Sequence, residues 1–305
     1  MFATPDVEKA AQNPKIAHVA HARRSLAYRK VVLLGWSGGG PLALFYQSQA
    51  ERPTVAHTPA DDAVDLTSAP LPPADAIIFQ AANSSRATLL AQWLVPSILD
   101  ENDPNRRDPE LDLYDPANPN HPPYSDAFIE RYRTAQLSRM RRRTAWVTDT
   151  LDFLRTRTGS EVERGFVTHR TMADLRFLDA TIDPNDRTPR TTHIGDPEAA
   201  NSGPAGLGRF STLRSWLSQW SIDHSNVNGP HNASAITVPL LSIRNSADEA
   251  APASDTRAIH DAAASADKTM HVVTGATHYY QGQPDLLAEA VATTIDWLGA
   301  RDLLD

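Results

Sequence analysis

The stretch VVLLGWSGGGP, residues 31–41, decides the fold of this chain. Its four leading apolar residues, two of them β-branched, predict a buried strand. The pattern Gly-x-Ser-x-Gly follows around Ser37, and the run 42–51 is compatible with a helix. A strand, a sharp turn and a helix around a serine form a nucleophile elbow, which lifts the hydroxyl clear of the sheet. The sequence therefore predicts that Ser37 is a nucleophile and that Gly35 and Gly39 must flank it as small residues.

Two later stretches place titratable side chains directly after apolar strands. In VPLLSIRNSADEAAP, residues 238–252, the adjacent acids Asp248 and Glu249 follow the strand. In MHVVTGATH, residues 270–278, His278 follows a strand through a turn that contains glycine. A serine hydroxyl is a weak nucleophile until a base removes its proton. His278 is the candidate base, because no other histidine of the chain follows a late apolar strand in this way.

These three stretches, in the chain order Ser37, Asp248, His278, resemble the α/β-hydrolase superfamily. The resemblance implies a doubly wound, mostly parallel sheet and a catalytic triad in which Asp248 orients His278. Asp248 fits the family's acid turn better than Glu249, although Asn245 stands where a glycine is commoner in the family. The resemblance also implies that the amide of Gly38 donates to the oxyanion.

The resemblance further implies that the first strands of the fold are missing. Only 36 residues precede Ser37, whereas the family places four more strands and a helix there. The loop that normally supplies the second oxyanion donor is not found. We therefore expect an N-terminally truncated hydrolase core in which the strand 31–35 is an unprotected edge. The chain as given should be poorly soluble and nearly inactive, and a version extended upstream should recover both properties.

The chain divides into three segments by its pattern. Residues 1–83 and 238–305 carry the strands of the core, including a buried strand at 76–79, whereas residues 84–237 lose the strand-like runs. Within that insertion we expect a long surface loop or a set of turns over 100–126, and a long amphipathic helix over 126–156. A helix at 171–179 and another at 213–220 are also expected. The insertion is predicted to form a large, mainly helical cap over Ser37.

The alternation of strands and helices returns after residue 238. We expect a strand at 239–244, a helix at 254–266, a strand at 270–274 and a last helix at 284–298, which together favour a parallel sheet with right-handed crossovers. The predicted buried face of the last helix consists of Leu287, Val291, Ile295 and Leu298.

The arginines of the long predicted helix invite two interpretations. Six of them lie between 131 and 143 and could bind an acidic substrate, but a solvated helix face is favoured. Four tryptophans of the insertion, at 93, 146, 216 and 220, could line an acyl pocket, but packing inside the cap is favoured. Trp36, next to the nucleophile, is a candidate substrate contact.

The composition excludes several classes of protein. A net charge of −8 argues against a nucleic-acid surface, and no apolar run is long enough to span a membrane. The absence of cysteine excludes disulfides and a cysteine nucleophile. No signal-peptide pattern occurs in residues 1–6, so a cytoplasmic location is expected. No metal and no cofactor are implied, and the oligomeric state is left open.

The residues thus favour a serine hydrolase that cleaves an ester, thioester or related acyl bond of a small molecule through an acyl-enzyme intermediate. The alternative is a truncated or non-catalytic chain of the same fold that acts as a binding protein.

Overall fold

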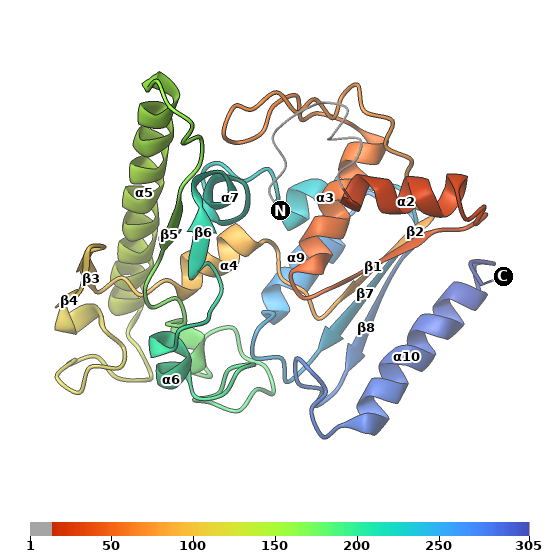
Figure 1. Cartoon of the computed structure of the whole chain (residues 1–305). Helices are drawn as coiled ribbons and strands as arrows, with labels where there is room; N and C mark the ends of the chain where they lie inside the picture. Colours follow the sequence, from red (N-terminus) through yellow and green to blue (C-terminus); the bar gives the residue numbers. More distant parts are fainter. Residues whose placement is uncertain (1–13, 305) are drawn as a thin grey trace. The chain divides into compact units, whose positions relative to one another are not determined.

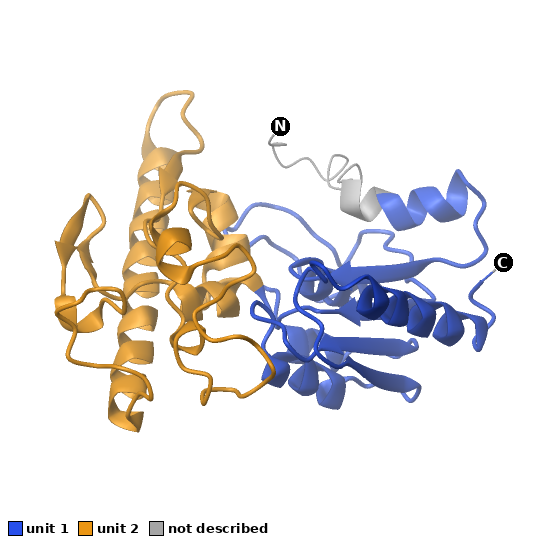
Figure 2. Cartoon of the chain, turned by 90° about the horizontal axis from the view of Figure 1, so that it is seen from below, with its two compact units in different colours: residues 1–85, 226–305 blue, residues 86–225 orange. Residues whose placement is uncertain are grey.

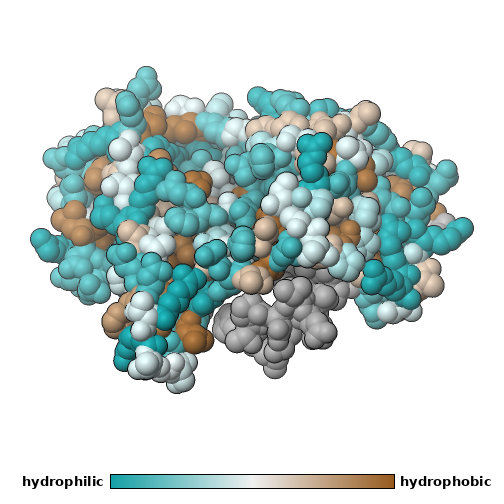
Figure 3. Space-filling model, turned by 90° about the horizontal axis from the view of Figure 1, so that it is seen from above, coloured by the Kyte–Doolittle hydropathy of each residue, from teal (hydrophilic) through white to brown (hydrophobic). Residues whose placement is uncertain are grey.

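The structure, a computed structural model of the chain, describes residues 14–304. Residues 1–13, where the sequence has no signal-peptide pattern, lie outside the described part. The chain forms two units: unit 1 combines residues 1–85 with 226–305, and unit 2 spans residues 86–225 (Figure 2). On the face drawn in Figure 3, hydrophilic residues predominate and apolar ones are scattered among them, as is usual for a protein surface. No helix within 14–304 is long and apolar enough to cross a membrane.

Unit 1 is built on a four-stranded parallel sheet with the order β1-β2-β7-β8 (Figure 1). The strands are β1 (Val32–Trp36), β2 (Ala76–Gln80), β7 (Leu240–Asn245) and β8 (Lys268–Val273). Each begins within two residues of its expected position, because short apolar runs bounded by turn residues are a strong strand signal. The predicted α/β class with a parallel sheet is confirmed.

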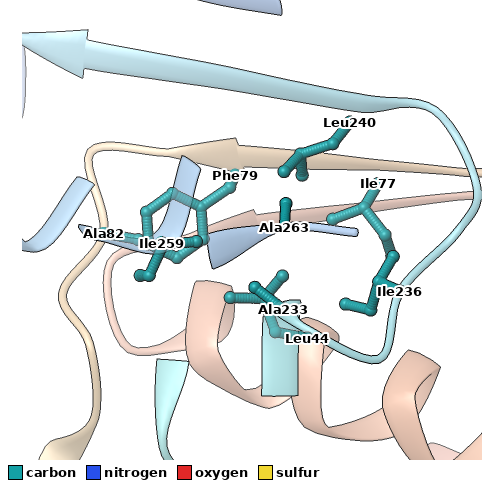
Figure 4. Close-up of a cluster of buried hydrophobic side chains, with 9 residues drawn as sticks. All are labelled: Leu44, Ile77, Phe79, Ala82, Ala233, Ile236, Leu240, Ile259 and Ala263. Carbon is teal, nitrogen blue, oxygen red and sulfur yellow. The ribbon is translucent and has the colours of Figure 1, made fainter. Parts of the chain in front are cut away.

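Helices cover both faces of this sheet, as the alternation of side chains along β2 requires. Ile77 and Phe79 are fully buried with Leu44 and Ile259 in a cluster on one face (Figure 4). The helices on that face are α3 (Gly39–Glu51), α8 (Gly229–Ala233) and α9 (Ala253–Ala262). Ala76 and Ile78 belong to a second cluster, which includes residues of α10 (Pro284–Gly299). The sheet is therefore doubly wound.

The strand β1 lies at an edge of the sheet. Within residues 14–304, β1 pairs with β2 and with no other strand. The side chains of Leu34 and Trp36 are 53% and 41% exposed. As expected, β1 is an edge strand in the part of the chain that the structure describes. The helix α2 (Pro14–Arg24) is held near the start of β1 by Asp75, which accepts hydrogen bonds from Arg23 and from the amide of Val31.

The prediction for the buried face of α10 is wrong for three of its four residues. Leu287, Val291 and Ile295 are 46–50% exposed, whereas Ala290 and Trp297 are buried against the sheet. The apolar stripe of α10 is wider than the surface that the sheet offers, so the helix packs through one flank of the stripe and leaves the other exposed.

Unit 2 consists of one long helix, several short ones and two separate antiparallel pairs of strands. The long helix α5 (Asp126–Thr156) has the predicted bounds. The other helices are α4 (Arg86–Trp93), η1 (Pro109–Leu111), η2 (Leu175–Phe177), α6 (Pro197–Ser202), α7 (Leu213–Ser215) and η3 (Trp216–Trp220). The pairs are β3 (Ile98–Asp100) with β4 (Asp103–Arg107), and β5 (Gly165–Val167) with β6 (Phe210–Thr212). None of these strands joins the central sheet.

Local turn chemistry explains two differences from the expected elements of unit 2. The segment expected to be loop over 100–126 includes β4, because the polar residues after β3 form a tight turn that lets the chain fold back. The helix expected at 171–179 is only the single turn η2, which Asp174 caps by accepting from the amide of Arg176. Residues 226–237, which the sequence pattern placed in the insertion, lie in unit 1 through α8. The position of the insertion over Ser37 stays a prediction.

The arginines of α5 do not form a purely solvated face, so that interpretation is wrong for two of them. Arg139 is fully buried and donates to both carboxylate oxygens of Glu101, at 2.7 and 2.9 Å. Arg143 is also buried and donates to the same carboxylate at 3.0 Å. Burial by itself would raise the pKa of Glu101, but the two guanidinium groups lower it. The carboxylate of Glu101 thus accepts hydrogen bonds from two successive turns of α5.

Candidate active site

Ser37 sits in a strained turn between β1 and α3. Its φ of 53° lies in the left-handed region, which is costly for a residue with a Cβ atom. The amide of Ser37 donates to the carbonyl of Gln80 at the end of β2, 3.2 Å away, and its carbonyl accepts from the amide of Gly40 at 3.1 Å. These bonds hold the half-buried hydroxyl at the carboxyl end of the sheet, where open α/β sheets gather their ligands.

Close packing of the backbone makes this turn possible. A Cβ atom on Gly35 would lie 2.6 Å from the Cα of Gly40, and one on Gly40 would lie 2.4 Å from the Cβ of Ala82. A Cβ on Gly39 would meet nothing within 4 Å. The predicted need for a small residue is therefore confirmed at Gly35 and wrong at Gly39, and the sequence analysis missed Gly40. With this elbow on a doubly wound parallel sheet, the α/β architecture and the strand, turn and helix predicted around Ser37 are confirmed.

The structure brings Ser37, His278 and Asp248 together at this edge. The Oγ of Ser37 lies 3.1 Å from Nε2 of His278, and Nδ1 of His278 lies 3.0 and 3.1 Å from the two carboxylate oxygens of Asp248. An ionised carboxylate only accepts, so Nδ1 carries the proton and Nε2 accepts from the serine hydroxyl. His278 and Asp248 are buried, at 1% and 3% exposure. The geometry is that of a nucleophile, a base and an orienting acid.

The two neighbouring acids have different partners. The Oδ1 of Asp248 also accepts from the amides of Ala250 and Ala251, at 2.7 and 2.8 Å, so its carboxylate is fixed by its own turn. Glu249 instead accepts from the backbone amide of His278 at 3.3 Å. Asp248 therefore contacts the imidazole ring of His278, whereas Glu249 contacts the backbone amide of the same residue.

The environment of Glu249 disfavours its charge. Burial raises the pKa of Glu249 above its ordinary value of 4.5, and the nearby charge of Asp248 adds to the rise. The amide of His278 opposes this shift by donating to the carboxylate. The carboxylate of Glu249 thus lies at hydrogen-bond distance from the loop that carries His278, so a change in its charge affects that loop directly.

Gly38 stands at the amino terminus of α3 as its N-cap residue, with φ −63° and ψ −8°. Amides at this end of a helix carry partial positive charge and suit an anion. The amide of Gly38 follows the nucleophile directly, which is the position of one oxyanion donor in an elbow of this kind.

Two exposed aromatic rings flank the imidazole. Trp36 stacks on His278 with ring centroids 5.6 Å apart and an interplanar angle of 25°. Tyr279 meets Trp36 edge-on at 5.3 Å and His278 at 4.8 Å. The sequence analysis named Trp36 but missed Tyr279, whose position next to His278 was the available signal. Within the described residues, no group of three or more His, Cys, Asp or Glu side chains is placed to hold a metal ion.

No protein-family model and no curated protein matches the sequence. Several solved structures are similar in shape. They include the monoacylglycerol lipase of Paleococcus ferrophilus, with a TM-score of 0.41 and 15% identity over 96% of this chain and 75% of that one. VinJ has a TM-score of 0.39 and 16% identity over 97% and 76% of the two chains. The proline iminopeptidase of Mycobacterium smegmatis has a TM-score of 0.38 and 14% identity over 96% and 74%. The assignment of the α/β class depends on the chain's own strands and elbow.

The glycines of the elbow allow a matched test of its packing. We expect Gly35→Ala to lower the free energy of unfolding by about 1–3 kcal/mol, because the new methyl group overlaps the backbone of Gly40. Gly39→Ala should leave it unchanged or raise it by up to about 1 kcal/mol, because the site is open and alanine favours the helix. Urea unfolding of the two variants and the parent measures the difference. Equal stabilities for the two variants would contradict the described turn.

The raised pKa of Glu249 makes a prediction for the pH dependence of stability. Its charged form is less favourable in the folded than in the unfolded chain, so the parent loses stability as pH rises through the folded-state pKa. Glu249→Gln removes this titration. The variant should therefore gain stability relative to the parent as pH rises above about 4.5. Urea unfolding at a series of pH values measures this difference, and a constant difference across the series would show that the carboxyl is not perturbed.

Proposed function

We propose that this chain is a serine hydrolase that cleaves an ester, thioester or related acyl bond of a small molecule. The observation that carries the proposal is the continuous line from the Oγ of Ser37 through His278 to Asp248, with each step at 3.0–3.1 Å. Isolated Ser–His contacts occur elsewhere in the chain, as between Ser242 and His260 at 3.3 Å. Among the residues that the structure describes, only the line at Ser37 also has a serine in a strained turn at a strand end and a buried acid behind the imidazole.

The mechanism follows from the positions of the groups. His278 takes the hydroxyl proton at Nε2 while Ser37 Oγ attacks the acyl carbon. Asp248 holds the imidazole in the tautomer with the proton on Nδ1 and stabilises the imidazolium that forms. The amide of Gly38 donates to the oxyanion of the tetrahedral intermediate. The imidazolium then protonates the leaving group, and water activated by the same base hydrolyses the acyl-enzyme.

The surroundings of the triad suit a substrate with an apolar part. Trp36 and Tyr279 are 41% and 49% exposed, and both contact the ring of His278. Exposed aromatic faces bind apolar and planar groups through their large contact area. We therefore assign Trp36 the role of a substrate contact, with Tyr279 beside it.

A covalent probe separates this function from that of a binding protein with the same fold. A fluorophosphonate reacts with an activated serine, which binding alone does not require. We expect one label per chain, on Ser37, and no label after Ser37→Ala. The same substitution should lower kcat towards p-nitrophenyl acetate by at least ~10³-fold with little change in stability. The proposed function is refuted if neither the folded chain nor a version extended upstream is labelled.

The neighbouring acids provide a second, matched test. Asp248→Ala removes the partner of His278 Nδ1, so we expect kcat to fall about 10⁴-fold. Glu249→Ala leaves the triad intact and should lower kcat by less than about tenfold, since it removes only an acceptor for a backbone amide. Steady-state rates of the two variants decide between the acids. A larger loss for Glu249→Ala would mean that the acid is misassigned.

A further inference from the structure

A series of buried and partly buried hydrogen bonds joins the loop of His278 to the ends of two strands and uses no side chain of the candidate triad. Nε2 of Gln80 donates to the hydroxyl of Tyr280 at 3.2 Å, and that hydroxyl donates to Oδ1 of Asn245 at 2.7 Å. Nδ2 of Asn245 in turn donates to the carbonyl of Thr277 at 2.8 Å. These hydrogen bonds thus connect the ends of β2 and β7 to the loop that carries His278.

The hydrogen bond to the carbonyl of Thr277 fixes which group donates and which accepts in each of these bonds. A backbone carbonyl only accepts, so the group of Asn245 that faces Thr277 must be the amide nitrogen. Oδ1 of Asn245 therefore faces Tyr280 and accepts a hydrogen bond, which the phenol donates. Burial raises the pKa of Tyr280 above 10, so the phenol keeps its proton and can donate at neutral pH.

The bonds reach both sides of His278. Thr277 precedes it, and Tyr280 follows it by two residues with a φ of 53°, a conformation that needs support from its surroundings. Gln80 also accepts the amide of Ser37 at its backbone carbonyl. One residue at the end of β2 is therefore connected to the nucleophile through its main chain and to the histidine loop through its side chain.

Because Asn245 and Tyr280 are buried, these hydrogen bonds favour one conformation of the loop that carries His278. Asn245 and Tyr280 are 2% and 8% exposed. A displaced loop would leave the amide of Asn245 or the phenol buried without a partner, which costs far more than a normal hydrogen bond gains. The network therefore favours the loop conformation in which Nε2 of His278 meets Ser37.

We propose that Gln80, Tyr280 and Asn245 are positioning residues. They hold Nε2 of His278 at hydrogen-bond distance from the hydroxyl of Ser37. The proposal rests on the proposed hydrolase function. Proton transfer requires the base at hydrogen-bond distance from the hydroxyl, and small displacements of a catalytic group reduce rates strongly. None of the three residues touches the reacting atoms, so their effect is on the rate of the chemical step rather than on substrate binding.

The test compares two identical substitutions that each remove one phenolic hydroxyl group in unit 1. Tyr280→Phe breaks the network, and Tyr46→Phe removes the bond from Tyr46 to the carbonyl of Pro72 at 2.7 Å, away from the triad. Fluorophosphonate labelling of the full chain gives the maximal rate of inactivation, kinact, and the half-saturating concentration, KI. We expect Tyr280→Phe to lower kinact about tenfold to 100-fold at unchanged KI, with Tyr46→Phe within about twofold of the parent.

A second variant and a second measurement separate positioning from stability. Asn245→Asp keeps the size of the side chain but removes the donor to Thr277, and it should lower kinact in the same way as Tyr280→Phe. Amide hydrogen exchange in the peptide that contains residues 275–280 should become faster in both variants and stay unchanged in Tyr46→Phe. A purely structural role would give similar losses of thermal stability in both tyrosine variants without the difference in kinact.

The outcomes distinguish the two proposals. If the parent is labelled at Ser37 and both network variants retain the kinact of Tyr46→Phe, the positioning role is wrong and the hydrolase function stands. If neither the folded parent nor a version extended upstream is labelled, the hydrolase function fails and the positioning role fails with it. A lower kinact together with faster exchange in 275–280, in both network variants, supports the proposal.

Discussion

The contact between the backbones of Gly35 and Gly40 is the constraint on which this structure depends. It lets α3 begin directly over the end of β1, and this forces Ser37 into a left-handed conformation that presents its hydroxyl at the sheet edge. The same contact places the amide of Gly38 at the start of a helix, where an anion is favoured. A strained serine persists only because its surroundings determine its conformation more than once: by the packing, and by the bonds of its amide and carbonyl.

The parallel arrangement of the strands then brings the other groups to the same place. β2 and β7 are neighbours, and β8 lies beyond β7, so the turns that follow these strands emerge side by side. Asp248 is fixed by two amides of its own turn, and His278 is held between this carboxylate and the hydroxyl of Ser37. Each group is oriented by a different element, so the site combines rigid strand ends with short loops.

Unit 2 combines buried apolar clusters with buried ion pairs on α5. Arg139 is fully enclosed and satisfied by Glu101 and by the carbonyls of Val95 and His169. Such a pair contributes little net stability, but removing one partner leaves a buried charge and is costly. The arrangement therefore specifies one position of α5 within its own unit. Nothing in the periodicity of the helix indicated this, because arginine at a helix surface is usually solvated.

The sequence by itself determined the four strands of the central sheet, the long helix α5, the elbow and the residue types of the candidate triad with their order. These features are local, since each depends on apolar runs and turn residues close together in the chain. The tertiary structure decided what depends on distant partners: that Gly40 rather than Gly39 must lack a side chain, that Arg139 and Arg143 are buried against Glu101, and that α10 leaves part of its apolar stripe exposed. The bond between Ser37 and His278 joins residues 241 positions apart. Its length is set by how strands and helices pack, and no local pattern contains that information.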